Sequence, residues 1–409
     1  MANRSIKNWI FNTLRFYYQR YFFYSKRNPS IWAFSAWEGN RYSDNCKYFY
    51  EHVKENHKEI RCVWFTQNKF VFSKLKQQGD EVYFIGSAES RIMQLKAGIS
   101  FYTNGMDDFG DNPYIYGSLI VSLWHGVSFK RLYGDDNFKG YNKIELFFRK
   151  IKNNIFNPVF RDISFTTSKY MKNKYIAQFY LKDSNNVFLS GQPRNDIFSK
   201  PILKEEMFND NISKIIENKK IILYMPTHQS FNNQQELADI VYSLDGDKNF
   251  NNFLTDKNYI VLLKLHYLAK DDDMNLKNII ILKDNMISDV QQLLAVTDIL
   301  ITDYSSVFAD FALTDRPIIF FRPNDETYLE KAGLYDEFKK VCSLNKVTTK
   351  EGLIRILKLI IENNYDYHPQ NNLINEYFAD PSIDKESYSE NVYKVIINEI
   401  TKRSGKFRF

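Results

Sequence analysis

The sequence predicts an α/β protein built from two Rossmann-like domains that face each other across a cleft. Three observations predict this fold class: a length of 409 residues, short apolar runs that alternate with polar stretches of helical length, and a restart of this alternation after a polar segment. A chain of this length favours more than one compact domain. Hydrophobic residues make up 44% of the sequence and charged residues 25%, which excludes a mainly disordered chain.

The candidate strands fall into two series. The first series covers residues 31–34, 61–66, 81–85, 99–103, 119–124, 163–166 and 187–190. A polar connector with a helix follows at 200–219, and the second series covers 221–224, 260–264, 279–281, 298–301 and 317–321. Apolar residues recur at helical spacing between strands, as in 44–56, 287–295 and 307–313. We therefore expect an N-terminal domain at 29–199, a C-terminal domain at 200–380, and a C-terminal helix with a basic tail at 381–409.

The first 28 residues form a basic and aromatic segment. Its basic residues precede the first carboxylate and account for the whole net charge of +6: Arg4, Lys7, Arg15, Arg20, Lys26 and Arg27. The apolar runs are too short and too often interrupted for a transmembrane span or a signal peptide. Two interpretations stay open: an amphipathic helix on an anionic membrane surface, or a helix whose aromatic face packs on the body. A second basic and apolar stretch, 143–161, could reinforce membrane binding.

The cysteine content indicates the redox compartment. The three cysteines are Cys46, Cys62 and Cys342, and none has CxxC spacing. They provide neither a disulfide framework nor a zinc motif, so a reducing, cytoplasmic compartment is expected.

A histidine follows the apolar run at 119–124. His125 and Gly126 then stand on a strand-to-helix turn. A neutral imidazole can accept a proton near pH 7, and glycine lets a phosphate or a substrate hydroxyl approach the backbone. The alternative is a histidine that caps a buried turn.

Three further strand ends carry polar side chains. Arg194, in the turn 190–196, could clamp a phosphate through its guanidinium group, and the alternative is a structural pair with Asp196. Pro226 fixes a turn in which Thr227 can donate to a phosphate. Lys264 and His266 alternate to the same side at the end of a strand; the alternative is a solvated edge.

The run 298–311 gives the sharpest signal. A buried strand is followed by Ser305 and Ser306, which open a helix. Backbone N–H groups at a helix start favour phosphate, and Asp310 could accept hydrogen bonds from a polyol or a ribose. The alternative makes Ser305 a plain N-cap.

The motifs at the strand ends resemble, in their order and approximate spacing, those of the CDP-glycerol glycerophosphotransferase family. This family comprises the teichoic acid primases and polymerases. The motifs are Trp124-His125-Gly126, the stretch 191–196, Pro226-Thr227, Lys264-Leu265-His266 and the stretch 302–306. The stretches 42–45 and 316–320 add support, and the resemblance covers about residues 31–380.

The resemblance implies a GT-B fold and a peripheral enzyme on the cytoplasmic face of the membrane. The reaction implied is the transfer of glycerol phosphate or a related polyol phosphate, with release of CMP, in teichoic acid or capsule-like polymer synthesis. The implied partners are a CDP-glycerol or CDP-polyol donor, a lipid-linked acceptor and an anionic membrane surface, without nucleic acid. By matching position, the donor-binding residues are His125, Gly126, Val127, Ser128, Phe129, Arg194, Pro226, Thr227, Lys264, Leu265, His266, Ser305, Ser306 and Asp310.

Some positions depart from the family pattern. His228 and Gln229 stand where an aromatic residue and arginine are common, and Tyr267 replaces a proline. The run 127–129 replaces the commoner Thr-Pro-Leu. These changes touch the donor pocket and leave the polyol open.

Phosphoryl transfer assigns roles to the residues at the strand ends. His125 is expected to be the general base for the acceptor hydroxyl, while Lys264 and His266 neutralise the pyrophosphate and His266 protonates the leaving group. The sequence requires no metal cofactor and leaves a divalent ion unassigned, because Asp107-Asp108 and 271–273 fit solvated loops.

Three other functions compete with this interpretation. A GT-B glycosyltransferase that uses a nucleotide sugar for surface polysaccharide shares the architecture. Nucleic-acid binding predicts basic residues spread over a groove, whereas here they stop at Arg27. A non-catalytic scaffold gives no reason for histidine, lysine and arginine to end separate strands.

Overall fold

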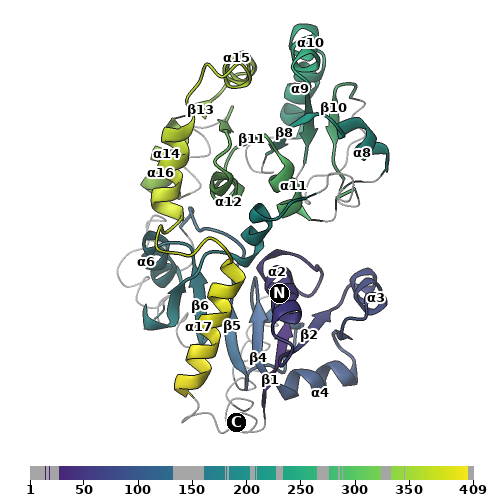
Figure 1. The fold of residues 1–409 in the computed structure, drawn as a ribbon, viewed down its shortest axis with the longest axis vertical. Helices are drawn as coiled ribbons and strands as arrows, with labels where there is room; N and C mark the ends of the chain where they lie inside the picture. The colour runs from purple at the N-terminus through teal and green to yellow at the C-terminus, as the bar shows by residue number, and fades with distance from the viewer. Residues whose placement is uncertain are drawn as a thin grey trace, which may run out of the picture. The chain divides into compact units, whose positions relative to one another are not determined.

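The structure, a computed structural model, contains two compact units (Figure 1). It describes residues 27–131, 161–179, 181, 184–202, 208, 210–226, 234–264, 276–283, 286–287, 289–323, 333–344 and 346–403, with Leu14 and Tyr18. Unit 1 comprises Met1–His125, Leu132–Asp196 and Asp380–Phe409, and unit 2 comprises Gly126–Arg131 and Ile197–Ala379. Each unit holds one parallel sheet, which confirms the α/β class and the two Rossmann-like halves.

The sheet of unit 1 has the strand order β3-β2-β1-β4-β5-β6-β7 in the described part of the chain. All of its pairs are parallel, and Trp32 of β1 lies opposite Cys62 of β2 and Ile99 of β4. Most of these strands are continuous apolar runs, as expected for parallel strands covered on both faces. The strands are β1 (Asn28–Phe34), β2 (Arg61–Thr66), β3 (Val82–Phe84), β4 (Ala97–Tyr102), β5 (Leu119–Ser122), β6 (Ile163–Thr166) and β7 (Val187–Leu189).

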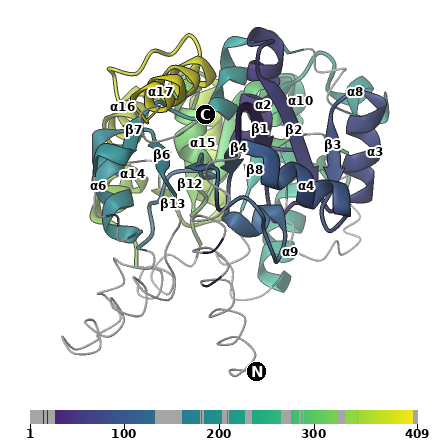
Figure 2. The ribbon, with the colours of Figure 1, turned by 90° about the horizontal axis from the view of Figure 1, so that it is seen from below.

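Helices cover both faces of this sheet, and α3 and α6 lie at its opposite edges (Figure 2). Side chains of Asn68, Ser87 and Ser168 cap α3, α4 and α6 by accepting backbone N–H groups of the first turn. The helices are α2 (Asp44–Asn56), α3 (Lys69–Gln77), α4 (Ala88–Lys96), α6 (Lys169–Gln178) and α17 (Tyr388–Arg403), with 3-10 helices at Met106–Phe109, Ser184–Asn186 and Pro193–Ser199.

The C-terminal helix α17 completes the core of unit 1. Its Val392 and Ile396 are fully buried in the same apolar cluster as Trp32 and Phe101. The Tyr393 ring lies 5.8 Å from that of Trp32. Helix α17 therefore packs against α2 and the first sheet (Figure 1).

The sheet of unit 2 has the order β10-β9-β8-β11-β12-β13 among the described residues, again with parallel pairs. The strands are β8 (Lys220–Met225), β9 (Tyr259–Leu263), β10 (Ile279–Ile281), β11 (Ile299–Thr302), β12 (Ile318–Phe321) and β13 (Lys346–Val347). The helices are α8 (Asp210–Ile216), α9 (Gln234–Asp245), α10 (Lys248–Asp256), α11 (Val290–Val296), α12 (Val307–Phe311), α14 (Asp336–Ser343), α15 (Lys350–Ile361) and α16 (His368–Phe378), with a 3-10 helix at Ala312–Thr314. The two residues of β13 give no periodicity, so the sequence does not predict this strand.

The segment Gly126–Arg131 leaves the end of β5 and joins unit 2. Lys130 forms an antiparallel bridge with Leu334, and the Arg131 amide donates to the Gly333 carbonyl at 2.9 Å. The residues that follow His125 are therefore built into the other unit.

Arg27 requires a correction of the predicted N-terminal segment. Its side chain is 6% exposed and donates to the backbone carbonyls of Ala97 at 3.3 Å, of Tyr114 at 2.9 Å, and of Gln94. It holds unit 1 together, so it does not add to the surface charge. Apart from Leu14, Tyr18 and Arg27 onward, the predicted membrane segment lies outside the described residues, as does 143–160. No helix in the described part of the chain is both long and apolar enough for a membrane span.

Candidate functional site

The described residues of the predicted motifs lie at the carboxyl ends of both sheets. The strand order reverses between β1 and β4 in unit 1, and between β8 and β11 in unit 2. Ligands of open α/β sheets bind outside the carboxyl ends at such reversals. His125 follows β5, next to β4, while Pro226 follows β8 and Ser305 follows β11. Each unit therefore presents candidate site residues at the expected edge.

A strained turn presents His125. Trp124 has a positive φ of 55° and Gly126 has a φ of 152°. Because a bulky residue rarely adopts positive φ, other groups must hold it. The Asn45 side chain does so, donating to the Leu123 carbonyl at 3.2 Å and to the Trp124 carbonyl at 2.9 Å. This turn also explains why β5 ends at Ser122, before the predicted boundary at Trp124.

The hydrogen bonding of His125 defines its basic nitrogen. Its Nδ1 lies 3.3 Å from the Thr103 carbonyl oxygen. A carbonyl only accepts, so Nδ1 is the donor in this contact and Nε2 is left as the basic nitrogen. The ring packs beside Trp124 and Trp37, with centroids 4.3 and 5.4 Å away. Burial lowers the pKa of His125, and Arg194 adds to this while Asp44 opposes it, so the imidazole is neutral near pH 7.

Arg194 lies directly behind the His125 turn. Its Nη1 donates to Asp44 Oδ1 at 2.9 Å and to the His125 carbonyl at 2.8 Å. Both charged side chains are buried. Asp44 begins α2 with a positive φ of 65° and accepts Trp37 Nε1 at 3.1 Å. The guanidinium group thus connects the start of α2 to the backbone of the candidate base.

The structure pairs Arg194 with Asp44, where the sequence suggested a structural pair with Asp196. The Asp196 carboxylate instead accepts the Tyr388 amide at 2.6 Å and the Ser389 amide at 3.0 Å, at the start of α17. A carboxylate near the first amides of a helix stabilises it, so the adjacent Asp196 anchors the C-terminal helix.

Asp108 is buried, and the prediction that it lies in a solvated loop is wrong. It is 0% exposed, and its carboxylate accepts the amides of Glu38 at 2.6 Å, Thr103 at 2.8 Å and Asn104 at 3.1 Å. Burial raises the pKa of Asp108 to about 7, against the effect of these hydrogen bonds. The side chain thus joins the loops that follow β1 and β4, on which the surroundings of His125 depend.

The second strand-end cluster lies in unit 2. Ser306 is the N-cap position of α12, which begins at Val307, and both Ser305 and Ser306 are half-buried. Lys264 follows β9, is buried, and donates its amide to the Tyr224 carbonyl at 2.9 Å. The predicted opening of a helix after two serines is confirmed.

Asp310 lies in the interior of unit 2. It is 2% exposed and its Oδ2 accepts a hydrogen bond from Gln291 Nε2 at 3.2 Å. Its role in binding a polyol or a ribose stays a prediction. Thr227, Leu265 and His266 lie outside the described residues, so their roles also stay predictions.

The run after His125 packs inside unit 2. Val127, Ser128 and Phe129 are each 6% exposed, and the Phe129 ring lies 4.4 Å from that of Phe338. Burial lowers the pKa of the neighbouring Lys130, while the carboxylate of Asp303 opposes the shift. Unit 2 therefore places a further cation close to the strand end that carries Ser305.

The structure thus brings His125 and Arg194 together in unit 1, with Trp37, Asp44, Asn45 and Thr103 around them. The sequence pattern predicts no role for these four residues, or for Lys130. A signal existed for Asp44 and Asn45, since both lie in the stretch 42–45 that supports the resemblance. Trp37 and Thr103 carry no local pattern, because only the adjacency of β1, β4 and β5 brings them to His125.

Comparisons with known proteins agree on one family. The family described as CDP-Glycerol:Poly(glycerophosphate) glycerophosphotransferase matches residues 17–398. The teichoic acid poly(glycerol phosphate) polymerase of Bacillus subtilis (strain 168) is 29% identical over 350 residues, which cover 81% of this chain and 44% of that protein. The teichoic acid poly(ribitol-phosphate) polymerase of Bacillus spizizenii is 28% identical over 304 residues, covering 67% of this chain and 44% of that protein. The chain therefore spans less than half the length of these relatives.

Among solved structures, the fold is similar to that of the wall teichoic acid polymerase TagF. A TagF structure soaked with CDPG superposes with a TM-score of 0.71 at 22% identity, covering 98% of this chain and 97% of that one. This likeness shows the fold, and it supports the GT-B architecture expected from the sequence.

Proposed function

This chain belongs to the CDP-glycerol:poly(glycerophosphate) glycerophosphotransferase family, and we propose that it transfers glycerol phosphate from CDP-glycerol to a hydroxyl of a lipid-linked acceptor. The observation that carries this proposal is the family match over residues 17–398, together with a half-buried neutral imidazole at the carboxyl edge of the first sheet. The product belongs to teichoic acid or a capsule-like surface polymer, and CMP leaves.

The proposed reaction is a single displacement at phosphorus. The acceptor oxygen forms a bond to the phosphorus of the glycerol phosphate group, and the bond from that phosphorus to the CMP oxygen breaks. His125 Nε2 takes the proton of the attacking hydroxyl, since Nδ1 faces the Thr103 carbonyl. The carbonyl contact orients the ring, and burial keeps it free of a competing proton.

Positive charge and hydrogen-bond donors would stabilise the donor phosphates. Lys264 supplies a buried cation at the end of β9, and Ser305 and Ser306 supply hydroxyls after β11. Arg194 and His266 complete the set expected from the sequence. The relatives include both a glycerol phosphate and a ribitol phosphate polymerase, so the donor test must compare the two polyols.

We expect the purified chain to release CMP from CDP-glycerol when a lipid-linked acceptor is present. Lys264→Ala should raise the KM for CDP-glycerol, because it removes a cation that would contact the pyrophosphate. The double variant Ser305→Ala/Ser306→Ala should raise it too, because it removes two hydroxyl donors. The loss of one charge-assisted hydrogen bond of about 1.5–3 kcal/mol corresponds to roughly 10- to 150-fold in affinity. Turnover of radiolabelled CDP-glycerol measures the KM, and calorimetry measures the affinity for CDP-glycerol.

Lys339→Ala is the matched control, since Lys339 is an exposed lysine of the same unit that pairs with Asp336. It should leave the KM and the affinity for CDP-glycerol unchanged.

A panel of CDP-glycerol, CDP-ribitol and UDP-sugars identifies the donor. Turnover of a UDP-sugar alone would contradict the proposed reaction and favour the glycosyltransferase alternative.

The N-terminal segment is proposed to hold the enzyme on the cytoplasmic face of the membrane. Without Arg27, which is buried in unit 1, five basic residues remain: Arg4, Lys7, Arg15, Arg20 and Lys26. Each contributes about 1 kcal/mol near an anionic surface, and the attraction weakens with salt. Deletion of residues 1–26 should therefore release the protein from anionic vesicles while Arg27 continues to stabilise unit 1. Vesicle flotation measures the bound fraction.

A variant in which only these five residues become glutamine separates charge from apolar insertion. Vesicles without anionic lipid should bind the full chain weakly. If the truncated chain floats with anionic vesicles as well as the full chain does, the aromatic face packs on the body and does not anchor the protein.

A further inference from the structure

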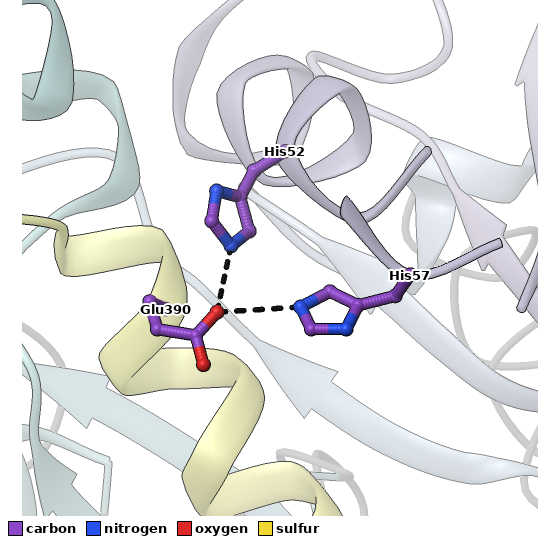
Figure 3. Close-up of side chains that lie close together, drawn as sticks. All are labelled: His52, His57 and Glu390. Carbon is purple, nitrogen blue, oxygen red and sulfur yellow. Dashed lines mark hydrogen bonds and ion pairs between the residues drawn. The ribbon is translucent and has the colours of Figure 1, made fainter. Parts of the chain in front are cut away.

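Two histidines and a glutamate of unit 1 converge on one point (Figure 3). His52 lies on α2, His57 follows the end of that helix, and Glu390 lies in the first turn of α17. Both Nε2 atoms point at the same oxygen, Glu390 Oε2, at 3.0 Å from His52 and 3.2 Å from His57. One possible ligand atom from each side chain lies within 4.8 Å of the other two. The sequence predicts no metal site here, because Glu390 is 338 positions from His52.

These distances fit the first coordination sphere of a transition metal ion. Zinc lies about 2.0–2.2 Å from histidine nitrogen and carboxylate oxygen, so two ligands of a tetrahedral site are roughly 3.3 Å apart. Two imidazoles and one carboxylate suit zinc and its neighbours better than magnesium or calcium, which take oxygen ligands. We propose that His52, His57 and Glu390 bind a divalent transition metal ion such as Zn²⁺, which fastens α17 to α2.

The backbone holds the three ligands in place without a metal. The chain leaves the helix at His57, whose φ of −126° and ψ of 74° are not helical, so its ring turns toward α17. That ring stacks on Tyr393, with centroids 3.4 Å apart and an angle of 13° between the planes. Asp196 binds the first amides of α17, and Ser387 Oγ accepts the Glu390 amide at 3.1 Å. Preorganised ligands lose little conformational entropy on binding an ion.

The second ring nitrogens also have polar neighbours. A histidine that binds a metal usually donates its other N–H to a carboxylate or an oxygen. His57 Nδ1 faces Glu59 Oε1 at 3.8 Å, and the Tyr393 hydroxyl donates to the same Glu59 oxygen at 3.1 Å. When the metal binds, a neutral histidine carries its ring proton on Nδ1, so that Nε2 is free to coordinate. Glu59 Oε1 then lies beside the Nδ1 proton of His57.

The cluster is open to water and ions. The exposed fractions of the side chains of His52, His57 and Glu390 are 18%, 16% and 31%. Three protein ligands leave a fourth position for water in a tetrahedral site. None of the three residues has a role in the proposed transfer reaction, so the metal would stabilise the docking of the C-terminal helix on unit 1.

Calorimetric titration of the metal-free full chain with Zn²⁺ tests the inference. We expect the wild type to bind one zinc ion. The affinity for zinc should fall by at least 10- to 100-fold in His52→Ala, His57→Ala and Glu390→Gln, the range seen for changes around bound metals. His368→Ala is the matched control, since His368 pairs with Asp366 on the surface of unit 2 and should bind as the wild type does. Zinc should raise the melting temperature of the wild type and the control alone.

Cobalt provides a second measurement that does not depend on stability. Co²⁺ bound by two imidazoles should give a visible absorption band, which His52→Ala and His57→Ala abolish. Far-UV circular dichroism without metal checks that the variants fold. The metal site would be overturned if the wild type did not bind zinc, or if the three variants bound zinc as tightly as the wild type does. The three side chains would then form only a hydrogen-bonded histidine–glutamate cluster.

Discussion

His125→Ala should lower the turnover of CDP-glycerol by about 100- to 10,000-fold, the usual effect of losing a general base. The imidazole is half-buried and neutral, and its Nδ1 faces the Thr103 carbonyl, so Nε2 is the atom that would receive the proton. The KM for CDP-glycerol should change far less than kcat, because the proposed role is in the chemical step. Steady-state kinetics with radiolabelled donor measures both constants.

His368→Ala serves as the control, because this exposed histidine lies in unit 2 beside Asp366. It should retain wild-type turnover. Far-UV circular dichroism and calorimetric donor binding show whether the His125 variant is folded and still binds. Near-normal turnover of a folded His125→Ala protein would refute the base assignment.

Arg194→Ala should destabilise unit 1 by about 3–5 kcal/mol, the cost of leaving one partner of a buried ion pair alone. The substitution leaves the Asp44 carboxylate without its guanidinium partner and removes the hydrogen bond to the His125 carbonyl. The sequence of unit 2 contains no tryptophan, and Trp32, Trp37, Trp64 and Trp124 lie in unit 1. Intrinsic fluorescence during urea unfolding therefore reports the stability of this unit.

A double-mutant cycle with Asp44→Asn isolates the pair. The double variant should be less destabilised than the sum of the two single variants, since it leaves no unpaired charge. Arg194→Lys should recover part of the stability but not the paired geometry of the guanidinium group. Additive effects in the cycle would show that the 2.9 Å contact contributes nothing specific.

Arg194 also separates positioning from donor binding. If its contact with the His125 carbonyl positions the base, Arg194→Ala should lower kcat and move the acid limb of the pH–rate profile. If it clamps the donor phosphates, the KM for CDP-glycerol should rise instead. A variant that lowers stability alone would assign Arg194 a structural role.

Much of the fold could be predicted from local pattern. The strands Arg61–Thr66, Ile163–Thr166 and Ile279–Ile281 and the helix Asp44–Asn56 have the predicted bounds. Parallel strands covered on both faces must be continuous apolar runs, which stand out between polar stretches. The predicted placement of His125 and Ser305 after strands followed from the same pattern.

Positions whose role depends on distant partners could not be predicted. Asp108 follows another aspartate in a polar stretch, which is typical of a surface loop, yet amides of two loops surround it. Arg27 ends a run of basic residues but is buried beneath three carbonyls. A run of charged residues predicts that their side chains are exposed to solvent. Only the tertiary structure shows that one of them is buried.

The sequence by itself thus determined the α/β class, two sheets, the family and the strand ends that carry chemistry, because hydrophobic periodicity and short motifs are local. The tertiary structure alone decided which of these side chains meet. Arg194 reaches Asp44 across 150 positions, and Glu390 reaches His52 across 338. Such contacts form because charged and polar groups that become buried need hydrogen-bonding partners. Which partner is available depends on the order of the strands in the sheet, and no local sequence pattern encodes that order.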